Sequence, residues 1–365
     1  MRFLDACARR PVDATPVWLM RQAGRYLPEY RAIRERMAFI DMCKQPDIAA
    51  EVTLQPLRRF ELDAAIVFAD ILLPLEPMGI GFTFTAEGGP VIDHPIRSGR
   101  DVKGVRAIDP RGELDYVMET LRIVRRELDG KTPLIGFAGA PFTLASYVVE
   151  GGHSRNYARV KQLMLDEPVT FSHLMGLLSE VVTGYLLAQI EAGAQAVQLF
   201  DSWAGWLSPF DYERAVLPHV RYVVDSVRGH GAPVIYFANG AAGMLPLVAQ
   251  AGADVYGVDW RVDLDAAWAQ LGDAAVQGNL DPATLLGPTE ANEERVADVL
   301  RRAGGRPGHI FNLGHGMLPE ASPDNVGFLV DAVHRLSARG GAPAPGAAPA
   351  STDDPTAAAA AEEDA

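Results

Sequence analysis

Eight short apolar segments, separated by turn residues, constrain the fold of this chain more than any other feature. Most of them are continuous apolar runs and not alternating ones, a pattern typical of strands covered on both faces, as in parallel sheets. The segments are PVWLM (16–20), AAIVFA (64–69), PLIGFAG (133–139), AVQLFD (196–201), PVIYFA (233–238), DVYGVD (254–259), AAVQGN (274–279) and HIFNLG (309–314).

Helical patterns lie between these strand segments. In the clearest of them, residues 172–194, apolar side chains recur at i, i+3, i+4 and i+7, and Gly193 is placed as a stop. The last helix starts with Ser322 as N-cap and Pro323 at the first helical position. Because consecutive parallel strands need crossover helices, the alternation predicts an α/β fold, a single (β/α)₈ TIM-type barrel. An open doubly wound sheet is the alternative.

Two regions depart from this alternation. Residues 71–93 follow the second strand segment and predict an extra hairpin, with Gly88 and Gly89 near its turn. Residues 341–365 are rich in Ala, Pro and Gly and carry five acids and no base, which predicts a disordered tail. The sequence therefore predicts one barrel domain over residues 1–340 followed by the tail.

The acidic composition limits the class of ligand. The formal charge is −14, and subtracting the −5 of the tail leaves −9 for residues 1–340. Such a chain is not expected to bind nucleic acid or a membrane surface, which normally requires a basic face. The N-terminus lacks the apolar stretch of a secretory signal, and no apolar run suggests a membrane span, so we expect a cytoplasmic protein with a small soluble ligand.

Metal and nucleotide sites are not indicated by the sequence. The two cysteines, Cys7 and Cys43, lack paired-motif spacing and a nearby histidine, so both are expected to be ordinary thiols. No His/Asp/Glu cluster has metal-ligand spacing, and GFAGAP and NLGHGM match neither GxGxxG nor a P-loop. We therefore expect a site without metal or cofactor.

Polar residues follow most of the strand segments, where the active site of a barrel is built. For each Asp, Ser and Asn among them, capping of the following helix is the alternative to a role in the site. The candidates are Arg21, Asp70, the Gly-Ala-Pro of 139–141, Asp201, Ser202, Asn239, Asp259, Asn279, Asp281 and His315.

The segment MRQAGR (20–25) places two arginines beside the first strand. A guanidinium withdrawn from water needs an anionic partner, so Arg21 and Arg25 predict either an anionic ligand or an internal salt bridge, for example to Glu29. Arg31 and Arg34 lie on a helix predicted to open at residue 28, where a solvated face is favoured, with an inward position of Arg34 left open.

Two further candidates each allow a structural reading. His315 ends the eighth strand between two glycines and can be structural or catalytic. Tyr147 lies in GAPFTLASYVVEGG and can be a site residue or a core aromatic with a satisfied hydroxyl. Its position in the sequence alone does not decide between these readings.

Six blocks of the sequence closely resemble the uroporphyrinogen decarboxylase family. The similarity runs in order from residue 3 to residue 336, and the first and last blocks are highly specific. The blocks are PVWLMRQAGRYLPEYR, LQPLRRFELDAAIVFADIL, PLIGFAGAPFTLASYVVEGG, QLFDSWAG, VQGNLDP and NLGHGMLP.

The resemblance implies a single (β/α)₈ domain, usually a homodimer with facing clefts, in haem and tetrapyrrole biosynthesis. The implied reaction converts uroporphyrinogen III to coproporphyrinogen III by removing four acetate carboxyls as CO₂, without a cofactor or metal. The substrate carries eight carboxylates, so the arginines would be its counter-ions in an acidic protein.

The resemblance also implies roles for individual residues. Asp70, as a carboxylate, would accept the central pyrrole N–H groups and stabilise a cationic ring, and Arg21 would be essential near the reacting acetate. Arg25 and the backbone of Gln22, Ala23 and Gly24 would contact the acidic side chains of the substrate. Further hydrogen bonds would come from Tyr147, Ser202 and His315. The proton donor stays open between Arg21 and a water polarised by Arg21 or His315.

Two competing functions have distinct sequence requirements. Zinc-dependent methyltransferases share the broad fold but need thiolate and histidine ligands, and no cysteine follows Cys43 here. A tetrapyrrole carrier on a decayed barrel should have lost the polar groups at its strand ends, and these groups are present.

Overall fold

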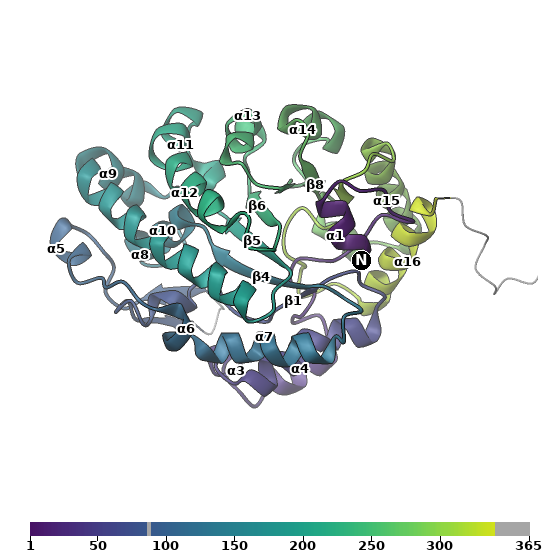
Figure 1. Ribbon diagram of the computed structural model, residues 1–365, viewed down its shortest axis with the longest axis horizontal. Helices are drawn as coiled ribbons and strands as arrows, with labels where there is room; N and C mark the ends of the chain where they lie inside the picture. Colours follow the sequence, from purple (N-terminus) through teal and green to yellow (C-terminus); the bar gives the residue numbers. More distant parts are fainter. Residues whose placement is uncertain (86–88, 340–365) are drawn as a thin grey trace, which may run out of the picture.

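The computed structural model describes residues 1–85 and 89–339, and its centre is a curled parallel sheet of seven strands (Figure 1). Neighbouring strands follow the order of the chain without reversal, so the doubly wound alternative, which requires a reversal of strand order, is wrong. The strands are β1 (Ala65–Ile66), β4 (Leu134–Gly139), β5 (Ala196–Asp201), β6 (Val234–Ala238), β7 (Val255–Gly257), β8 (Ala275–Gln277) and β9 (His309–Ile310). The tail expected at 341–365 lies outside the described residues.

Helices on the outside of this sheet connect its strands (Figure 1). The longer ones are α4 (Pro46–Arg59), α7 (Asp115–Glu127), α8 (Pro141–Glu150), α9 (Ala158–Asp166), α10 (Pro168–Glu191), α12 (Leu217–Val227), α14 (Leu264–Leu271), α15 (Thr289–Ala303) and α16 (Pro323–Ser337). The shorter ones are α1 (Arg2–Cys7), α2 (Pro28–Arg34), α3 (Phe39–Cys43), α5 (Gly99–Val102), α6 (Pro110–Glu113), α11 (Pro209–Ala215) and α13 (Leu245–Val248).

The predicted signals for the last helix are confirmed. The Ser322 side chain accepts a hydrogen bond from the N–H of Asp324 (3.2 Å), and Pro323 takes the first helical position. The helix predicted at 172–194 is α10, which ends at Glu191, just before Gly193 with φ +118°.

Helix α10 is also long and apolar enough to cross a membrane by length and hydropathy, which the sequence reading did not anticipate. However, 61% of its most apolar window is buried inside the protein, against β4 and the helices α8 and α12. These contacts are those of a core helix, whose apolar surface is covered by the sheet and by its neighbours.

The first predicted strand segment, 16–20, forms no regular strand but lies next to both edges of the sheet. Val17 makes a single parallel bridge with Phe311, which follows β9. The N–H of Phe311 donates to the Pro16 carbonyl and the N–H of Asp63, just before β1, donates to the Val17 carbonyl, both at 2.8 Å. The segment therefore lies between the edge strands β1 and β9 and contacts the residues that flank them, with only a few backbone hydrogen bonds.

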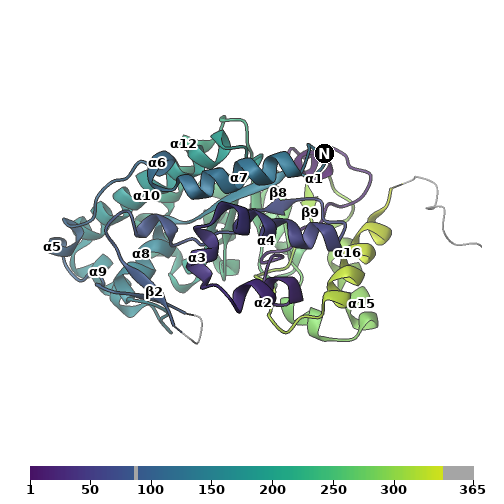
Figure 2. The same cartoon turned by 90° about the horizontal axis from the view of Figure 1, so that it is seen from below.

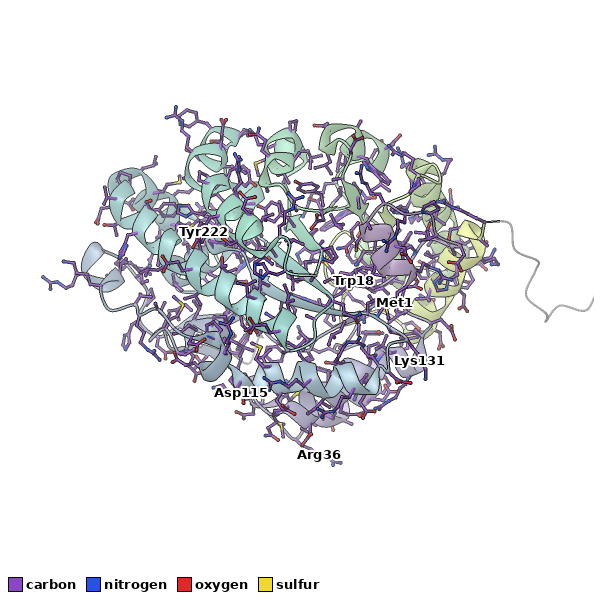
Figure 3. All side chains as sticks on the ribbon, in the orientation of Figure 1. Met1, Trp18, Arg36, Asp115, Lys131 and Tyr222 are labelled. Carbon is purple, nitrogen blue, oxygen red and sulfur yellow. The ribbon has the colours of Figure 1, made fainter. Side chains whose placement is uncertain are left out.

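A buried polar chain ties this segment to the interior of the sheet. Trp18 is fully buried and is labelled near the middle of Figure 3, and its indole N–H donates to Gln277 Oε1 at 2.9 Å. Gln277 then donates to Gln198 (3.1 Å), and the Gln198 amide lies 3.9 Å from the sulfur of Met20. Each of these polar groups has a partner inside the core. The side chains of Gln198 on β5 and Gln277 on β8 therefore hold segment 16–20 in place.

Asp63 is the second tie between this segment and the rest of the fold. Its carboxylate accepts from the N–H of Val17 (2.8 Å) and from Arg2 (2.8 Å), and the Nε2 of His334 lies 2.7 Å away. We expect Asp63→Ala to lower the free energy of unfolding by about 2–4 kcal/mol, because the buried N–H of Val17 and the side chains of Arg2 and His334 lose their partner. Urea unfolding measures this, with exposed Asp331→Ala on α16 as the control; equal stability of the two variants would contradict the assigned role.

The region after β1 contains a second, antiparallel pair of strands. β2 (Phe82–Phe84) pairs with β3 (Pro90–Ile92), in register Phe82 to Ile92. Residues 86–88, including the Gly88 expected near the turn, lie outside the described residues. Val91 also bridges to Gly152, so the pair is joined to the segment after α8. Figure 2 shows the pair below the strands of the sheet, on the same side as α2.

Candidate active site

A cavity of about 740 Å³ opens at the carboxyl ends of the strands, and we call it the cleft. Its wall comes from segments far apart in the chain, chiefly 20–26, 66–72 and 315–319, together with residues of α8, the β2–β3 pair and the loop after β5. Eight of the nine residues assigned to the site from the sequence line it: Arg21, Ala23, Gly24, Arg25, Asp70, Tyr147, Ser202 and His315.

Gln22 does not line the cleft. Its side chain is fully buried, accepts from the N–H of Leu19 (3.0 Å) and donates to the carbonyl of Ala64 (3.1 Å). Its own carbonyl accepts the hydroxyl of Tyr26 at 2.8 Å. Gln22 thus anchors the loop that carries the two arginines to the residues before β1.

Asp70 stands four residues beyond the end of β1, in the wall of the cleft. Burial raises the pKa of its carboxyl to about 6, while the hydrogen bond from the N–H of Leu72 (2.8 Å) and the charge of Arg21 oppose the rise. At neutral pH the group is mostly a carboxylate, and its desolvation strengthens any interaction with a positive charge in the cleft.

The arginine side chains of the cleft have no acidic partner in the described part of the chain. Neither Arg21 nor Arg25 forms a side-chain hydrogen bond or an ion pair with residues of 1–85 or 89–339. The internal salt bridge to Glu29 is wrong, since Glu29 pairs with Arg59 at 2.8 Å. The guanidiniums that line the cleft are therefore available to an anion.

Arg34 also lines the cleft, which the solvated-face interpretation of its helix did not favour. It is the last residue of α2 and is exposed, as the solvated-face interpretation expects, and its guanidinium donates to the carbonyl of Met37 beyond the helix at 3.0 Å. Among residues 1–85 and 89–339, the cleft thus holds three arginines against the one carboxylate of Asp70, a local positive balance in a chain of net charge −14.

His315 presents a defined tautomer. Its Nδ1 lies 2.7 Å from the N–H of Gly316, and because a backbone N–H can only donate, Nδ1 is unprotonated. Burial and, next, the charge of Arg21 lower the pKa of the ring to about 4. His315 is therefore neutral at physiological pH, with Nε2–H as its remaining hydrogen-bond donor.

Tyr147 and Ser202 complete the polar part of the wall. Tyr147 belongs to α8, and burial raises the pKa of its hydroxyl to about 12, so it is a neutral donor. Its ring packs edge-on against Trp203, with ring centroids 5.8 Å apart. Ser202 is the first residue after β5. The tyrosine therefore has both a packing role and a hydroxyl at the cleft.

The remaining strand-end candidates form hydrogen bonds within the fold, and of these only Asp281 caps a following helix, as the capping alternative predicts. The buried Asp201 carboxylate accepts from Thr143 (2.8 Å) and Tyr236 (2.9 Å), below the cleft. Three others hold backbone groups: Asp259 accepts the N–H groups of residues 240 and 261, Asn279 donates to the carbonyls of residues 259 and 262, and Asp281 caps the turn at 283. Asn239 donates to the carbonyl of Ser202 at 3.2 Å.

The apolar part of the cleft was missed by the sequence reading. Among the residues that the structure describes, six phenylalanines line it, and four of them lie within two residues of the end of a strand segment: Phe68, Phe137, Phe200 and Phe237. The repeated occurrence of phenylalanine near the strand ends was a sequence signal that could have predicted an apolar cleft wall. Trp203 and His153 were missed as well, and because they come from loops without a periodic pattern, no sequence signal marked them.

The arrangement suits one kind of ligand. An aromatic and aliphatic floor with one desolvated carboxylate can hold a flat or saucer-shaped apolar ring that carries donors or positive charge at its centre. The arginines and the neutral donors Tyr147 and His315 can bind anionic groups on the periphery of that ring. The geometry fits a macrocycle with acidic substituents.

Comparisons with known proteins agree with this geometry. The family model described as "Uroporphyrinogen decarboxylase (URO-D)" matches residues 1–336. A curated uroporphyrinogen decarboxylase of Carboxydothermus hydrogenoformans is 58% identical over 336 residues, covering 92% of this chain and 96% of that protein. One from Roseiflexus sp. is 57% identical over 343 residues, with 92% and 99% covered.

Solved structures show the same fold at low identity. A methyltransferase from Methanosarcina mazei superimposes with a TM-score of 0.79 at 21% identity, covering 92% of this chain and 98% of that one. A B12-independent methionine synthase from Shewanella gives 0.54 at 12% identity, with 88% and 94% covered. Within residues 1–85 and 89–339, no three His, Cys, Asp or Glu side chains come together as metal ligands, and Cys7 and Cys43 are buried thiols.

Proposed function

The chain belongs to the uroporphyrinogen decarboxylase family, and from that premise we propose that Asp70 and Arg21 carry the reaction in the cleft. The activity is that of a carboxy-lyase in tetrapyrrole biosynthesis, which decarboxylates the four acetate side chains of uroporphyrinogen III to give coproporphyrinogen III. The observation that supports the residue assignment is the placement of one desolvated carboxylate and three arginines in a single apolar cavity.

The chemistry requires an electron sink. Protonation of a pyrrole ring makes it cationic, and when the bond between the acetate carbon and its carboxyl breaks, CO₂ leaves and the electron pair neutralises the ring. A proton then adds to the exocyclic carbon to give a methyl group, and the ring proton is released. Each acetate thus consumes one proton and yields one CO₂.

Asp70 is assigned to stabilise the cationic ring. A carboxylate at the centre of the macrocycle accepts the inward pyrrole N–H groups and lies close to the charge that develops before CO₂ leaves. Because its environment is desolvated, the attraction is stronger than it would be in water. An oxidised porphyrin has fewer inward N–H donors, so the same contact selects the reduced substrate.

The arginines are assigned to the carboxylates of the substrate. Arg21 is placed at the reacting acetate, and Arg25, Tyr147 and Ser202 at the others. A guanidinium releases its proton reluctantly near neutral pH, so a water polarised by Arg21 or by Nε2–H of His315 is the easier proton donor.

The pH dependence follows from the pKa of Asp70. Because only the carboxylate stabilises a cation, we expect kcat/KM to fall about tenfold per pH unit below about pH 6. Asp201→Asn is the matched control, since burial raises the pKa of that carboxyl to about 6 as well, but it lies outside the cleft. In Asp201→Asn, kcat/KM should still fall below about pH 6, and in Asp70→Asn this fall should disappear. If the fall persists in Asp70→Asn, the group that titrates is not Asp70.

The activity is tested by incubating the purified protein with anaerobically reduced uroporphyrinogen III, with and without EDTA. Separation of the products by carboxyl number should show seven-, six-, five- and four-carboxyl species in succession, equally in both samples. Unchanged eight-carboxyl substrate would reject the function, and activity lost only with EDTA would reject the metal-free reaction.

We also propose that segment 16–20, the first in chain order, adds an eighth strand to the seven-stranded sheet and closes it into a (β/α)₈ barrel. This barrel would form one domain over residues 1–340. Hydrogen bonds to both edge strands support this closure. The β2–β3 pairing supports the extra hairpin after the second barrel strand.

We further propose that the protein is cytoplasmic and forms a homodimer with facing clefts. Two exposed apolar side chains on the segment after β5, Trp206 and Phe210, support an interface at that segment. Sedimentation equilibrium should give twice the chain mass of 39.3 kDa, and a monomer at micromolar concentration would reject the dimer.

A further inference from the structure

Arg21 is an exposed side chain in the wall of the cleft, as Arg25 is. Its backbone is left-handed, with φ +63°, and no ion pair with a residue of 1–85 or 89–339 fixes its guanidinium. A long, flexible side chain in this situation loses considerable rotamer freedom when it is held in one position. Its placement must therefore come from the segments packed around it.

The backbone of Met20, the residue before Arg21, is tied to the loop after β9. The N–H of Met20 donates to the side-chain oxygen of Asn312 (3.0 Å), and the carbonyl of Met20 accepts from the N–H of Met317 (2.9 Å). Asn312 is fully buried, and the same oxygen also accepts from the N–H of Leu313 (2.7 Å). Both backbone groups of Met20 are thus held by residues 312–317.

Gly316 of the same loop lies against the Arg21 side chain. A Cβ added to Gly316 would be 2.5 Å from Cδ, 2.7 Å from Nε and 2.9 Å from Cγ of Arg21, and these are its three nearest atoms. The φ of Gly316 lies outside the left-handed region, so the backbone does not itself require glycine. What the missing side chain provides is the space that the Arg21 stem occupies.

We propose that the loop 312–317 positions Arg21 for decarboxylation, with Asn312 fixing its backbone and Gly316 fixing the course of its side chain. Gly316 is a positioning residue and contacts no reacting atom itself. This inference rests on the proposed role of Arg21 at the reacting acetate. It explains why a glycine stands between His315 and Met317, both of which line the cleft.

The test is a double-mutant cycle between Gly316→Ala and Arg21→Ala. In the wild-type background we expect Gly316→Ala to lower kcat roughly 10²-fold, more than it changes KM, because the guanidinium is displaced from the acetate. In the Arg21→Ala background the same methyl group meets no arginine, so its further effect should be less than about twofold. Single-turnover rates at excess enzyme keep the slow variants measurable.

A matched control is Gly112→Ala in α6, where an added Cβ meets nothing within 4 Å. It should leave kcat and the thermal midpoint unchanged, and Gly316→Ala should also leave the thermal midpoint unchanged. Wild-type kcat in Gly316→Ala would overturn the inference. An equal loss in both backgrounds would overturn it as well, because the methyl group would then act on something other than Arg21.

The cycle remains decisive if Gly316→Ala does not fold. The three atoms nearest to the added Cβ all belong to Arg21, so the double variant should then recover the fold, and an unfolded double variant would reject the inference. Failure of the proposed function is a separate result: the wild-type protein would not decarboxylate uroporphyrinogen, or Arg21→Ala would retain full activity.

Discussion

Asp70→Asn is expected to lower the rate of decarboxylation roughly 10²-fold or more while leaving the protein folded. The amide keeps the size of the side chain and an oxygen that can still accept from Leu72. It loses the negative charge, so the cationic ring that must form before CO₂ leaves is no longer stabilised. Steady-state rates with uroporphyrinogen III, measured by product carboxyl number, give the effect.

Thermal unfolding separates this loss from a structural one. Because desolvation opposes the charge of Asp70 in the folded state, its removal should not lower the thermal midpoint. Asp70→Asn should therefore be at least as stable as the wild-type protein and still nearly inactive. Near-normal turnover would remove Asp70 from the mechanism.

Arg21→Ala should lower kcat roughly 10²- to 10³-fold, the loss expected when a preorganised donor at a reacting group is removed. Arg21→Lys keeps the charge but not the planar fork that binds a carboxylate through two N–H groups, so it should recover only part of the rate. The control is Arg36→Ala, an arginine outside the cleft that projects from the edge of the molecule in Figure 3.

The prediction for Arg21 concerns chemistry more than binding. In the proposed assignment, other carboxylates of the substrate still have Arg25, Tyr147 and Ser202 as partners, so KM should rise less than kcat falls. A variant whose KM rises while kcat stays normal would place Arg21 at a peripheral carboxylate and not at the reacting one. If Arg21→Ala is as active as Arg36→Ala, Arg21 contacts neither the reacting carboxylate nor a peripheral one.

Much of the fold could be predicted because buried parallel strands leave a strong local signal. β5 has the bounds of its predicted segment, 196–201, because a continuous apolar run is covered on both faces. Segment 16–20 carries the same signal but forms only one bridge, since its hydrogen bonds are shared between Phe311, Asp63 and the side chain of Asn312. Such long-range pairing is not encoded in a local pattern.

The site was predictable where chemistry and strand position coincide. Asp70, Arg21 and His315 line one cavity although they are distant in sequence, because the strands of a curled parallel sheet end at the same edge. Position alone could not separate Ser202, at the cleft, from Asp201, one residue earlier and fully buried. Successive residues of a strand point to opposite faces, and only the structure shows which face meets the cavity.

The excess of guanidinium groups in the cleft has a consequence for the order of events after binding. Each CO₂ that leaves removes one negative charge from the ligand, while the charge of the three arginines stays constant. The Coulomb attraction that retains the ligand therefore weakens with every turnover. The early intermediates are held for another cycle, and the finished product, with half of its original carboxylates, is the species that escapes most readily.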